Sequence, residues 1–283
     1  MSETSVVILT MGDRPEAIAE AISSARAQRA ATVEIVVVGN GAPIPEEVDA
    51  DVRVELGENV GIPEGRNRGA AAASAERILF LDDDGVLVDA DVLERAGNLF
   101  ARNPQLAVVG LGIIDEHGAS ARRHGPRLRG RSSGEATSFP GGASIVRREA
   151  FEQVGGLAGP FFYALEETDL AWRLLDAGWT VHYEPELRMR HPRSSPARHP
   201  SFVERTARNR VWLAHRSLPW PLAITYVAIW TLITAVRARG RPSTVRSHLA
   251  GTIDGIRAPL GPRHPMSWRT AAIMTRQGRP PIV

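Results

Sequence analysis

Short apolar runs alternate with segments of helical spacing along the first 112 residues. The runs cover residues 6–9, 35–38, 78–81 and 108–111. Such unbroken runs are typical of strands buried on both faces. Between them, apolar residues recur every three or four positions within 15–25, 64–75 and 91–102. This alternation predicts an α/β fold with a mostly parallel central sheet and helices on both faces.

The pattern becomes less regular after residue 112. Residues 117–134 are rich in Arg, Gly and Ser, which favours a mobile loop, and 144–146 is typical of a short strand. A helix is expected over 168–177, closed by Gly178, with extended pieces at 180–183 and 187–190. We therefore expect a catalytic domain over 1–200, with a nucleotide-binding half at about 1–112 and an acceptor half at 113–200.

The remainder, residues 201–283, is expected to form a C-terminal helical extension. It begins with a basic amphipathic helix over 202–216 and contains an uncharged, apolar stretch over 218–236. That stretch is just long enough to span a bilayer, but prolines at its start and aromatic residues in its middle also suit a helix in the interface plane. Three interpretations stay open: an interfacial segment, a buried or oligomer-forming helix, and a membrane span. Residues 245–256 predict a further helix, docked on the catalytic domain or at the membrane.

Charge and cysteine content limit the function classes. The chain has no cysteine, which excludes disulfides and thiolate chemistry. Its 34 strongly basic residues are all arginine, and they dominate after Arg188, whereas acids cluster before Asp176. This asymmetry favours a basic C-terminal face for phosphates or anionic lipid. No aromatic residues interleave with the arginines in a nucleic-acid-binding motif, so no nucleic-acid partner is expected.

The most informative stretch is "ILFLDDDG", residues 78–85, where Asp82, Asp83 and Asp84 follow a buried strand. In parallel sheets ligands bind beyond the carboxyl ends of the strands, so the loops 10–14, 39–41 and 82–85 should converge on one crevice. A divalent cation would remove the repulsion between the carboxylates. An exposed acidic turn is the simpler alternative, and phosphatases and nucleotidyltransferases also carry Asp at this position.

A second acidic group stands in "YALEETDLAWRLLDAGW", where Glu166, Glu167 and Asp169 begin a helix. Acids in a first turn complement the helix dipole, but a carboxylate fixed there could also act as a general base. His191, in "RMRHPRSS", is either a turn residue or a third metal ligand beside two aspartates.

Residues 5 to about 192 resemble the family 2 glycosyltransferases of the GT-A fold. The matching segments, in the family's order, are "VVILTMGDRPEAI", "EIVVVGNG", "NVGIPEGRNRGA", "FLDDDG", "PGGASIVRREAFEQVGG", "EETDLAWRLLDAGW" and "EPELRMRH". The fourth resembles the DXD motif and the sixth resembles the motif that carries the catalytic base. Each segment alone is a weak signal, but seven in order are specific.

The resemblance assigns a role to each matching residue. It implies that Asp82, Asp84 and His191 hold a Mn²⁺ or Mg²⁺ ion and that Glu167 is the catalytic base. It also implies that Asp83 lies against the donor, with Gly142 in the segment near the donor sugar. The residues implied for the nucleotide site are Thr10, Arg14, Asn40 and Arg66. The base position holds Glu where the family usually has Asp, which adds one methylene of reach.

The implied function is an inverting, metal-dependent transfer of a sugar from a nucleoside-diphosphate sugar to an acceptor hydroxyl. A glycan or lipid-linked acceptor is expected, in polysaccharide, glycolipid or cell-surface glycan synthesis. The alternatives are a nucleotidyltransferase acting on sugar-1-phosphate and a non-catalytic sugar-nucleotide-binding protein. The N-terminus lacks the basic region of a signal peptide. We therefore expect a cytoplasmic protein, with peripheral contact on the inner face of the membrane under the interfacial interpretation. Its oligomeric state stays open, with a dimer among the options.

Overall fold

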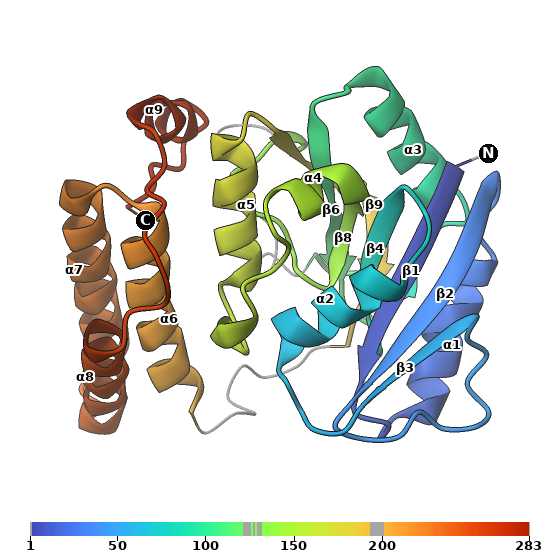
Figure 1. Cartoon of the computed structure of the whole chain (residues 1–283), viewed down its shortest axis with the longest axis horizontal. Coiled ribbons are helices and arrows are strands. Elements are labelled where there is room, and N and C mark those ends of the chain that lie inside the picture. Colours follow the sequence, from blue (N-terminus) through green and yellow to red (C-terminus); the bar gives the residue numbers. More distant parts are fainter. Residues whose placement is uncertain (1, 121–125, 127, 129–131, 193–200, 283) are drawn as a thin grey trace.

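A computed structural model describes residues 2–120, 126, 128, 132–192 and 201–282, and these form a layered α/β domain followed by packed helices (Figure 1). Within these residues nine strands build one sheet. The strands are β1 (Ser2–Thr10), β2 (Ala31–Asn40), β3 (Val52–Leu56), β4 (Arg77–Asp82), β5 (Val86–Leu87), β6 (Leu106–Ile114), β7 (Gly134–Glu135), β8 (Ala143–Arg147) and β9 (Thr180–Arg190).

The sheet has the order β3-β2-β1-β4-β8-β6-β9-β5, with β7 paired to β9. Strands β1 to β4 are mutually parallel, and β6 is parallel to β9. Strand β8 lies antiparallel between β4 and β6. The predicted mostly parallel sheet is therefore confirmed, and the antiparallel β8 brings its preceding loop to the carboxyl end of β4.

Two hydrophobic cores cover the two faces of the sheet. One face packs against α1 (Pro15–Arg26) and α3 (Val92–Arg102). The other packs against α2 (Ile62–Ala72), α4 (Arg148–Gln153) and α5 (Glu166–Asp176). Side chains alternate along a strand, so Ile78 and Phe80 enter one core while Leu79 and Leu81 enter the other. The unbroken apolar runs thus follow from burial on both faces.

Several elements differ from the sequence-based expectation, and β9, β3 and α4 are the most informative. The extended pieces at 180–183 and 187–190 are parts of the single strand β9, whose pairing with β6 shifts register opposite Leu111 and Gly112. Strand β3 was not predicted, because it is an edge strand whose alternate residues are exposed. The short helix α4 was not predicted either. Much of the expected loop over 117–134, namely 121–125, 127 and 129–131, lies outside the described residues.

The C-terminal part is helical, as expected. Helices α6 (Phe202–Ser217), α7 (Trp220–Arg237) and α8 (Pro242–Arg257) pack side by side, and α9 (Trp268–Arg276) follows (Figure 1). Ser267 caps α9, and its backbone N–H donates to Asp176 at the end of α5 over 2.8 Å. The end of the chain is therefore docked on α5, whereas the helix expected over 245–256, which is α8, packs against α6.

Helix α7 exposes most of its apolar surface. By length and composition alone, α7 could cross a membrane, but only 11% of its 18 residues are buried in the structure. Ala223 and Tyr226 face the protein, whereas Ile224, Leu232 and Val236 are 67%, 66% and 70% exposed. The interpretation as a helix buried within this chain is therefore wrong. The interfacial, oligomer-forming and spanning interpretations stay predictions.

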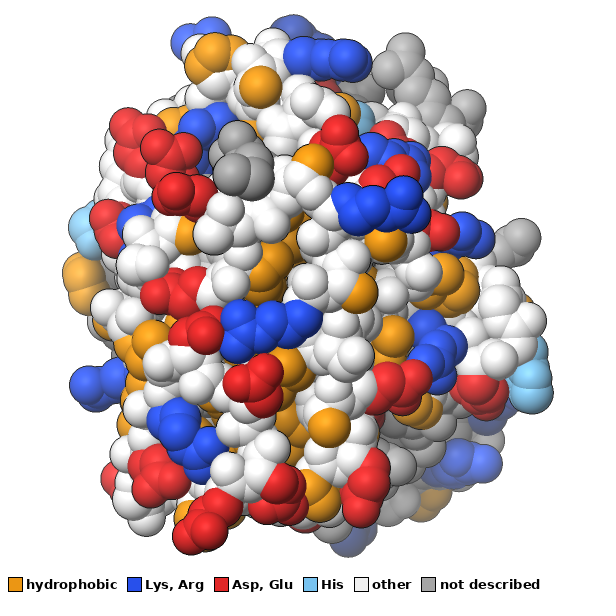
Figure 2. All heavy atoms as spheres, turned by 90° about the vertical axis from the view of Figure 1, so that its right-hand side faces the viewer, with side chains coloured by type: hydrophobic (Ala, Val, Ile, Leu, Met, Phe, Trp, Pro, Cys, Tyr) orange, Lys and Arg blue, Asp and Glu red, His pale blue; other side chains and the backbone are white. Residues whose placement is uncertain are grey.

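The opposite end of the molecule has a mixed surface. Figure 2 shows the face at the right-hand side of Figure 1, which carries β2, β3 and α1. Acidic side chains and arginines are interspersed there, and among the described residues neither sign forms a continuous patch on this face. The absence of a nucleic-acid partner stays a prediction.

Candidate active site

The loops that follow β1 and β4 meet at the carboxyl edge of the sheet. Strand β1 lies between β2 and β4, and all three run in the same direction, so their ends are neighbours. Arg14 extends from the first loop to the acidic triplet, where its Nη2 lies 2.8 Å from Oδ1 of Asp83 and its Nη1 contacts Asp84. The first loop therefore supplies a cation to the carboxylates that follow β4.

Asp82 is the most open carboxylate of the triplet, with its side chain 36% exposed. Its Oδ1 accepts from Nη2 of Arg66 over 2.8 Å, and its backbone N–H donates to the carbonyl of Gly142 over 3.1 Å. A Cβ at Gly142 would lie 2.0 Å from Oδ1 of Asp82. Glycine is therefore required there for the close approach of this carboxylate.

Asp83 is directed inward, with a side chain only 7% exposed. Burial raises the pKa of Asp83 to about 6, although the charge of Arg14 and a hydrogen bond from Thr10 act in the opposite direction. Thr10 is itself buried, and its hydroxyl also accepts from the backbone N–H of Gly12 over 3.0 Å. Thr10 thus fixes the first loop and Asp83 together.

Asp84 faces His191, which lies at the end of β9. The Nε2 of His191 is 3.0 Å from Oδ1 of Asp84 and 3.7 Å from Oδ2 of Asp82. The hydrogen bond with Asp84 raises the pKa of His191 to about 9. Burial alone would raise the pKa of Asp84, but His191 and Arg14 outweigh it and lower that pKa. Arg14, Arg66 and protonated His191 therefore balance the three carboxylates within the chain itself.

The predicted metal ligands lie near one another in this geometry. Among the described residues no three acidic or histidine side chains are gathered into a ready-made metal site. Asp82, Asp84 and His191 nevertheless lie together, and two carboxylates with an imidazole suit Mn²⁺ or Mg²⁺. The donor set therefore fits a divalent cation once His191 gives up its proton and Arg14 leaves Asp84. Metal binding by these residues stays a prediction.

Asn40, predicted as a nucleotide contact, is only 3% exposed. Its Nδ2 donates to Oδ1 of Asn59 over 3.0 Å, and its Oδ1 accepts from the backbone N–H of Val60 over 2.9 Å. In this geometry Asn40 orders the loop that leads into α2, which carries Arg66.

The predicted base, Glu167, stands at the start of α5. A Cβ at Gly141 would lie 3.0 Å from Nη1 of Arg66 and 3.7 Å from Cβ of Glu167, so the base and the triplet share one site. Burial raises the pKa of both Glu166 and Glu167, and the neighbouring Glu166 carboxylate raises that of Glu167 further. Glu166 is 4% exposed, with Oε1 3.9 Å from Nη1 of Arg66. Its Oε2 has no hydrogen-bond partner among the described residues.

The segment before Glu166 is strained. Phe162, Ala164 and Leu165 have φ of 63°, 71° and 72°, the left-handed region that non-glycine residues rarely adopt. Asn209 of α6 holds the segment, with Nδ2 3.0, 2.8 and 2.9 Å from the carbonyl oxygens of Phe161, Tyr163 and Ala164. Strain at a functional site persists only where surrounding contacts enforce it, and Asn209, fully buried, supplies them.

Sequence reasoning missed Asn209 and Tyr163. Burial, followed by the carboxylates of Glu166, Asp82 and Glu167, raises the pKa of the Tyr163 hydroxyl, so this hydroxyl faces the acidic groups of the site. The available signal for Asn209 was its position: an amide between Ala207 and Val211, on the apolar side of an amphipathic helix. A polar residue at such a position requires a buried partner.

Asp169, the third acid of its motif, has a different role. Its side chain is fully buried and pairs with Arg173 over 2.7 Å and with Arg216 of α6 over 3.2 Å. Arg173 in turn donates to the carbonyl of Gly156 over 2.7 Å. Asp169 therefore ties α5 to the C-terminal helices and lies outside the group of acids around Arg66.

Comparison with known proteins agrees with this geometry. The sequence profile described as "Glycosyl transferase family 2" matches residues 5–155, slightly more than half of the chain. A "dTDP-rhamnosyl transferase RfbF" of Shigella flexneri is 24% identical over 73% of this chain and 78% of the relative. An "N-acetylglucosaminyl-diphospho-decaprenol L-rhamnosyltransferase" of Mycobacterium tuberculosis is 34% identical over 28% of this chain and 27% of its own length. A "Pre-mycofactocin glycosyltransferase" of that organism is 27% identical over 56% of this chain and 37% of its own.

Solved structures show the same fold at low identity. The mannosyltransferase PcManGT from Pyrobaculum calidifontis, in complex with GDP-Man and Mn²⁺, is 17% identical with a TM-score of 0.57, covering 97% of this chain and 79% of that one. S. aureus TarS 1-349 with UDP-GlcNAc is 15% identical with a TM-score of 0.58, covering 76% and 66%. The fold is that of the GT-A glycosyltransferases, and the chain belongs to glycosyl transferase family 2.

Proposed function

We propose that this glycosyltransferase is inverting and metal-assisted, and that it transfers a sugar from a nucleoside diphosphate to a hydroxyl of a cell-surface glycan or lipid-linked acceptor. The observation that carries the proposal is the grouping of Asp82, Arg66 and Glu167 around Gly141 and Gly142. At one end of this group, Arg66 can contact a diphosphate and Asp82 can bind a divalent cation. At the other end, Glu167 can act as a base. Family membership removes the support for a nucleotidyltransferase or a non-catalytic binding protein.

The reaction follows from the charges of the chain's own residues. Glu167 takes the proton of the acceptor hydroxyl while the oxygen of that hydroxyl attacks C1 of the donor sugar. The bond from C1 to the phosphate oxygen breaks, and the nucleoside diphosphate leaves with the electron pair. Attack from the face opposite the leaving group inverts C1. Because its pKa is raised, Glu167 is a stronger base than an exposed glutamate.

The leaving diphosphate needs positive charge. Arg66 and Arg14 are the arginines positioned beside the triplet. A divalent cation held by Asp82, Asp84 and His191 would supply Lewis-acid stabilisation of the departing diphosphate. The mannosyltransferase PcManGT, which shares this fold, forms a complex with GDP-Man and Mn²⁺, and this complex further supports the proposal.

The names of the relatives guide the choice of substrates to test. Two of them are rhamnosyltransferases, and one of those names a lipid-linked diphosphate acceptor. We therefore rank dTDP-activated deoxysugars first among donors, followed by UDP- and GDP-sugars. The acceptor class that we propose is a sugar linked to a lipid through phosphate.

A thermal-shift panel tests the donor part of the proposal. The melting temperature is measured with dTDP-, UDP- and GDP-sugars, with Mn²⁺ and with EDTA. We expect stabilisation by one nucleotide class, and only with the metal. Glu167→Gln should keep this stabilisation and lose transfer. Near-normal turnover by Glu167→Gln would overturn the assignment of the base, and metal-independent stabilisation would overturn the metal site.

We also propose that the protein is cytoplasmic and contacts the inner face of the membrane through α7. The exposed apolar side chains of α7 are followed by the exposed arginines Arg237, Arg239 and Arg241, which suit anionic headgroups. A span is disfavoured because Arg210 of α6 lies 3.5 Å from the ring of Trp230, in the middle of α7.

Vesicle sedimentation tests this location. At low salt we expect binding to phosphatidylglycerol vesicles and weaker binding to phosphatidylcholine vesicles. Ile224→Glu with Leu232→Glu should weaken binding, whereas Val88→Glu, at an exposed apolar position of the catalytic domain, should not. A protein that ignores anionic vesicles would contradict the proposal.

A further inference from the structure

A cavity of about 420 Å³ lies away from the acidic triplet. It is bordered by α6, α8 and the segment around the short 3-10 helix η1 (Gly159–Phe161). This volume is in the range of small-molecule sites. It shares no lining residue with the site around the acidic triplet. Its lining residues are Pro160, Phe162, Ser201, Glu204, Arg205, Arg208 and Asp254.

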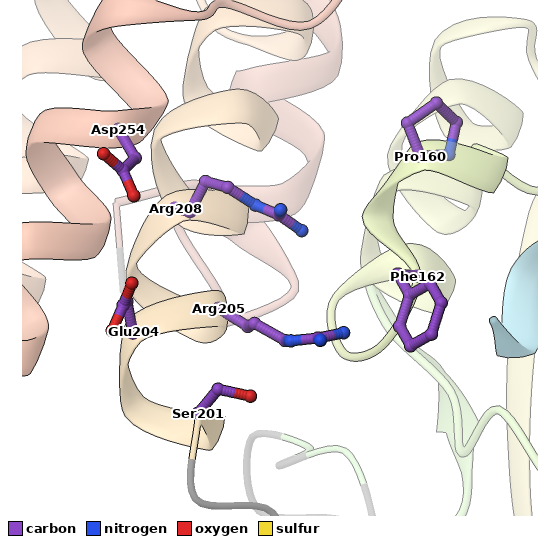
Figure 3. A pocket seen from close by; sticks show the side chains of 7 residues that line it. All are labelled: Pro160, Phe162, Ser201, Glu204, Arg205, Arg208 and Asp254. Atoms are coloured by element: carbon purple, nitrogen blue, oxygen red, sulfur yellow. The ribbon is translucent and has the colours of Figure 1, made fainter.

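The charges of this cavity are arranged unevenly. Figure 3 shows Arg205 and Arg208 extending from α6 toward Phe162 and Pro160, while Glu204 of α6 and Asp254 of α8 line the side of the cavity away from those two residues. Among the described residues, no carboxylate lies within ion-pair distance of either arginine. Burial, followed by the neighbouring charge of Arg205, lowers the pKa of Arg208. The two arginines therefore stand side by side on one part of the cavity, and Glu204 and Asp254, which line it beyond ion-pair distance, offset the lowering of the Arg208 pKa only in part.

Both guanidinium groups are held in place by aromatic rings. Arg205 lies 4.5 Å above the ring of Phe162, and Arg208 lies 4.1 Å above that of Trp212. Arg208 also donates to the carbonyl of Phe161 over 3.3 Å. Arginines stacked in this way lose little freedom on binding, and their planar forks match phosphate oxygens. The first turn of the 16-residue helix α6 adds its positive dipole end at Ser201.

The cavity shares a wall with the catalytic segment. Phe162 lines it, and the same strained backbone continues through Tyr163 and Leu165 into Glu166 and Glu167. A ligand whose anionic group rests between the two arginines therefore lies beside the segment that carries the base. This anionic group is also separate from Arg14 and Arg66, the cations proposed for the donor.

We infer that Arg205 and Arg208 form a phosphate-binding subsite for the acceptor. This subsite binds the diphosphate of a lipid-linked sugar, while a hydroxyl of that sugar faces Glu167. This inference rests on the proposed glycosyl transfer to a lipid-linked acceptor and adds the residues that recognise it. The chemistry recognised is a phosphate or diphosphate group. The alternative source of that group is free inorganic pyrophosphate.

Calorimetric titration of the full chain tests the subsite. The probe is geranyl diphosphate in EDTA, with geraniol and inorganic pyrophosphate as separate arms. We expect geranyl diphosphate to bind and geraniol not to bind. Arg205→Gln/Arg208→Gln should weaken binding at least tenfold, whereas Arg246→Gln/Arg257→Gln, which removes two arginines of α8 outside the cavity, should leave it unchanged.

Other variants distinguish the subsite from the donor site. Arg14→Gln should keep geranyl diphosphate binding, and its loss there would show that the probe occupies the donor site, which would overturn the inference. Unchanged binding in the double variant, or equal affinity for inorganic pyrophosphate, would also overturn it. If the double variant fails to fold, the single variant Arg205→Gln is measured instead, because the side chain of Arg205 contacts the chain through its stacking on Phe162. Normal metal-dependent donor stabilisation without geranyl diphosphate binding would refute this inference alone, whereas failed donor binding would refute the proposed function.

Discussion

Replacing Asn209 with alanine tests whether the C-terminal helices position Glu167, the proposed catalytic base. The Asn209 amide has two N–H groups and lies 2.8–3.0 Å from three carbonyl oxygens of the segment before Glu166. Its Oδ1 also accepts from Nη2 of Arg208 over 3.0 Å. The variant therefore removes two donors at a fully buried position: the carbonyl of Phe161 keeps its hydrogen bond from Arg208, whereas the carbonyls of Tyr163 and Ala164 lose the bond from Asn209.

The expected magnitude follows from these contacts. A buried polar group left without its hydrogen bond costs about 1–3 kcal/mol, so two of them give about 2–6 kcal/mol in unfolding free energy. The segment has an alternative, because Phe162, Ala164 and Leu165 can relax out of the left-handed region, where each residue costs on the order of 1 kcal/mol. Relaxation would preserve stability but move Glu167. In that case kcat should fall about 10- to 100-fold at unchanged nucleotide affinity.

Two measurements decide between these outcomes: urea unfolding, and transfer rate with nucleotide binding measured in parallel. Asn103→Ala is the matched control, because Asn103 is an exposed asparagine whose Nδ2 donates to Thr180 over 3.3 Å. That control should change unfolding free energy by less than about 0.5 kcal/mol. If Asn209→Ala keeps both its stability and its kcat, the reasoning that the strained segment depends on this amide is refuted.

Three further predictions concern the acids of the chain. Gly142→Ala should lower kcat/KM at least about tenfold, because its Cβ would displace Asp82, whereas Gly57→Ala, with open space around it, should not. Transfer should need deprotonated Glu167, so kcat should rise with pH through a midpoint above the ordinary glutamate value of about 4.3, and Glu166→Gln should lower that midpoint, as a pH–rate profile would reveal. Burial acts to raise the pKa of Glu34, but hydrogen bonds from Ser5 and Ser74 outweigh it and lower that pKa. The resulting stability is present above the unfolded-state pKa of Glu34 and is lost as pH falls through the folded-state pKa. Urea unfolding of Glu34→Gln should therefore lack this loss of unfolding free energy at low pH, whereas the exposed-site control Glu46→Gln should retain it.

Much of the fold could be predicted because its physical cause is local. An unbroken run such as 78–81 is possible only where both faces of a strand are covered, so it indicates a central strand. Strand β3 could not be found in this way, because an edge strand with exposed Arg53 and Glu55 has no such run. The continuity of β9 was hidden by the register shift near Pro185, which made one strand resemble two.

The active site was only partly predictable, since its neighbours are distant in sequence. The order of motifs singled out Asp82, Glu167 and His191, and the structure brings His191 to the triplet. What the motifs did not predict was the balance of charge. The sequence suggested a divalent cation against the acids, whereas Arg14, 70 residues before Asp84, contacts that carboxylate directly. No pattern of composition or spacing specifies such a pair.

The dependence of the segment before Glu166 on α6 has a consequence for how such enzymes diversify. The family profile ends at residue 155, yet the contacts that set the position of Glu167 come from Asn209, beyond that boundary. Changes in the C-terminal helices can therefore shift the base relative to a bound donor without altering a residue of the matched region. A lineage could change its acceptor through drift in a part of the chain that motif searches do not score. A chimera joining this catalytic domain to another member's helices should inherit acceptor preference from the helices.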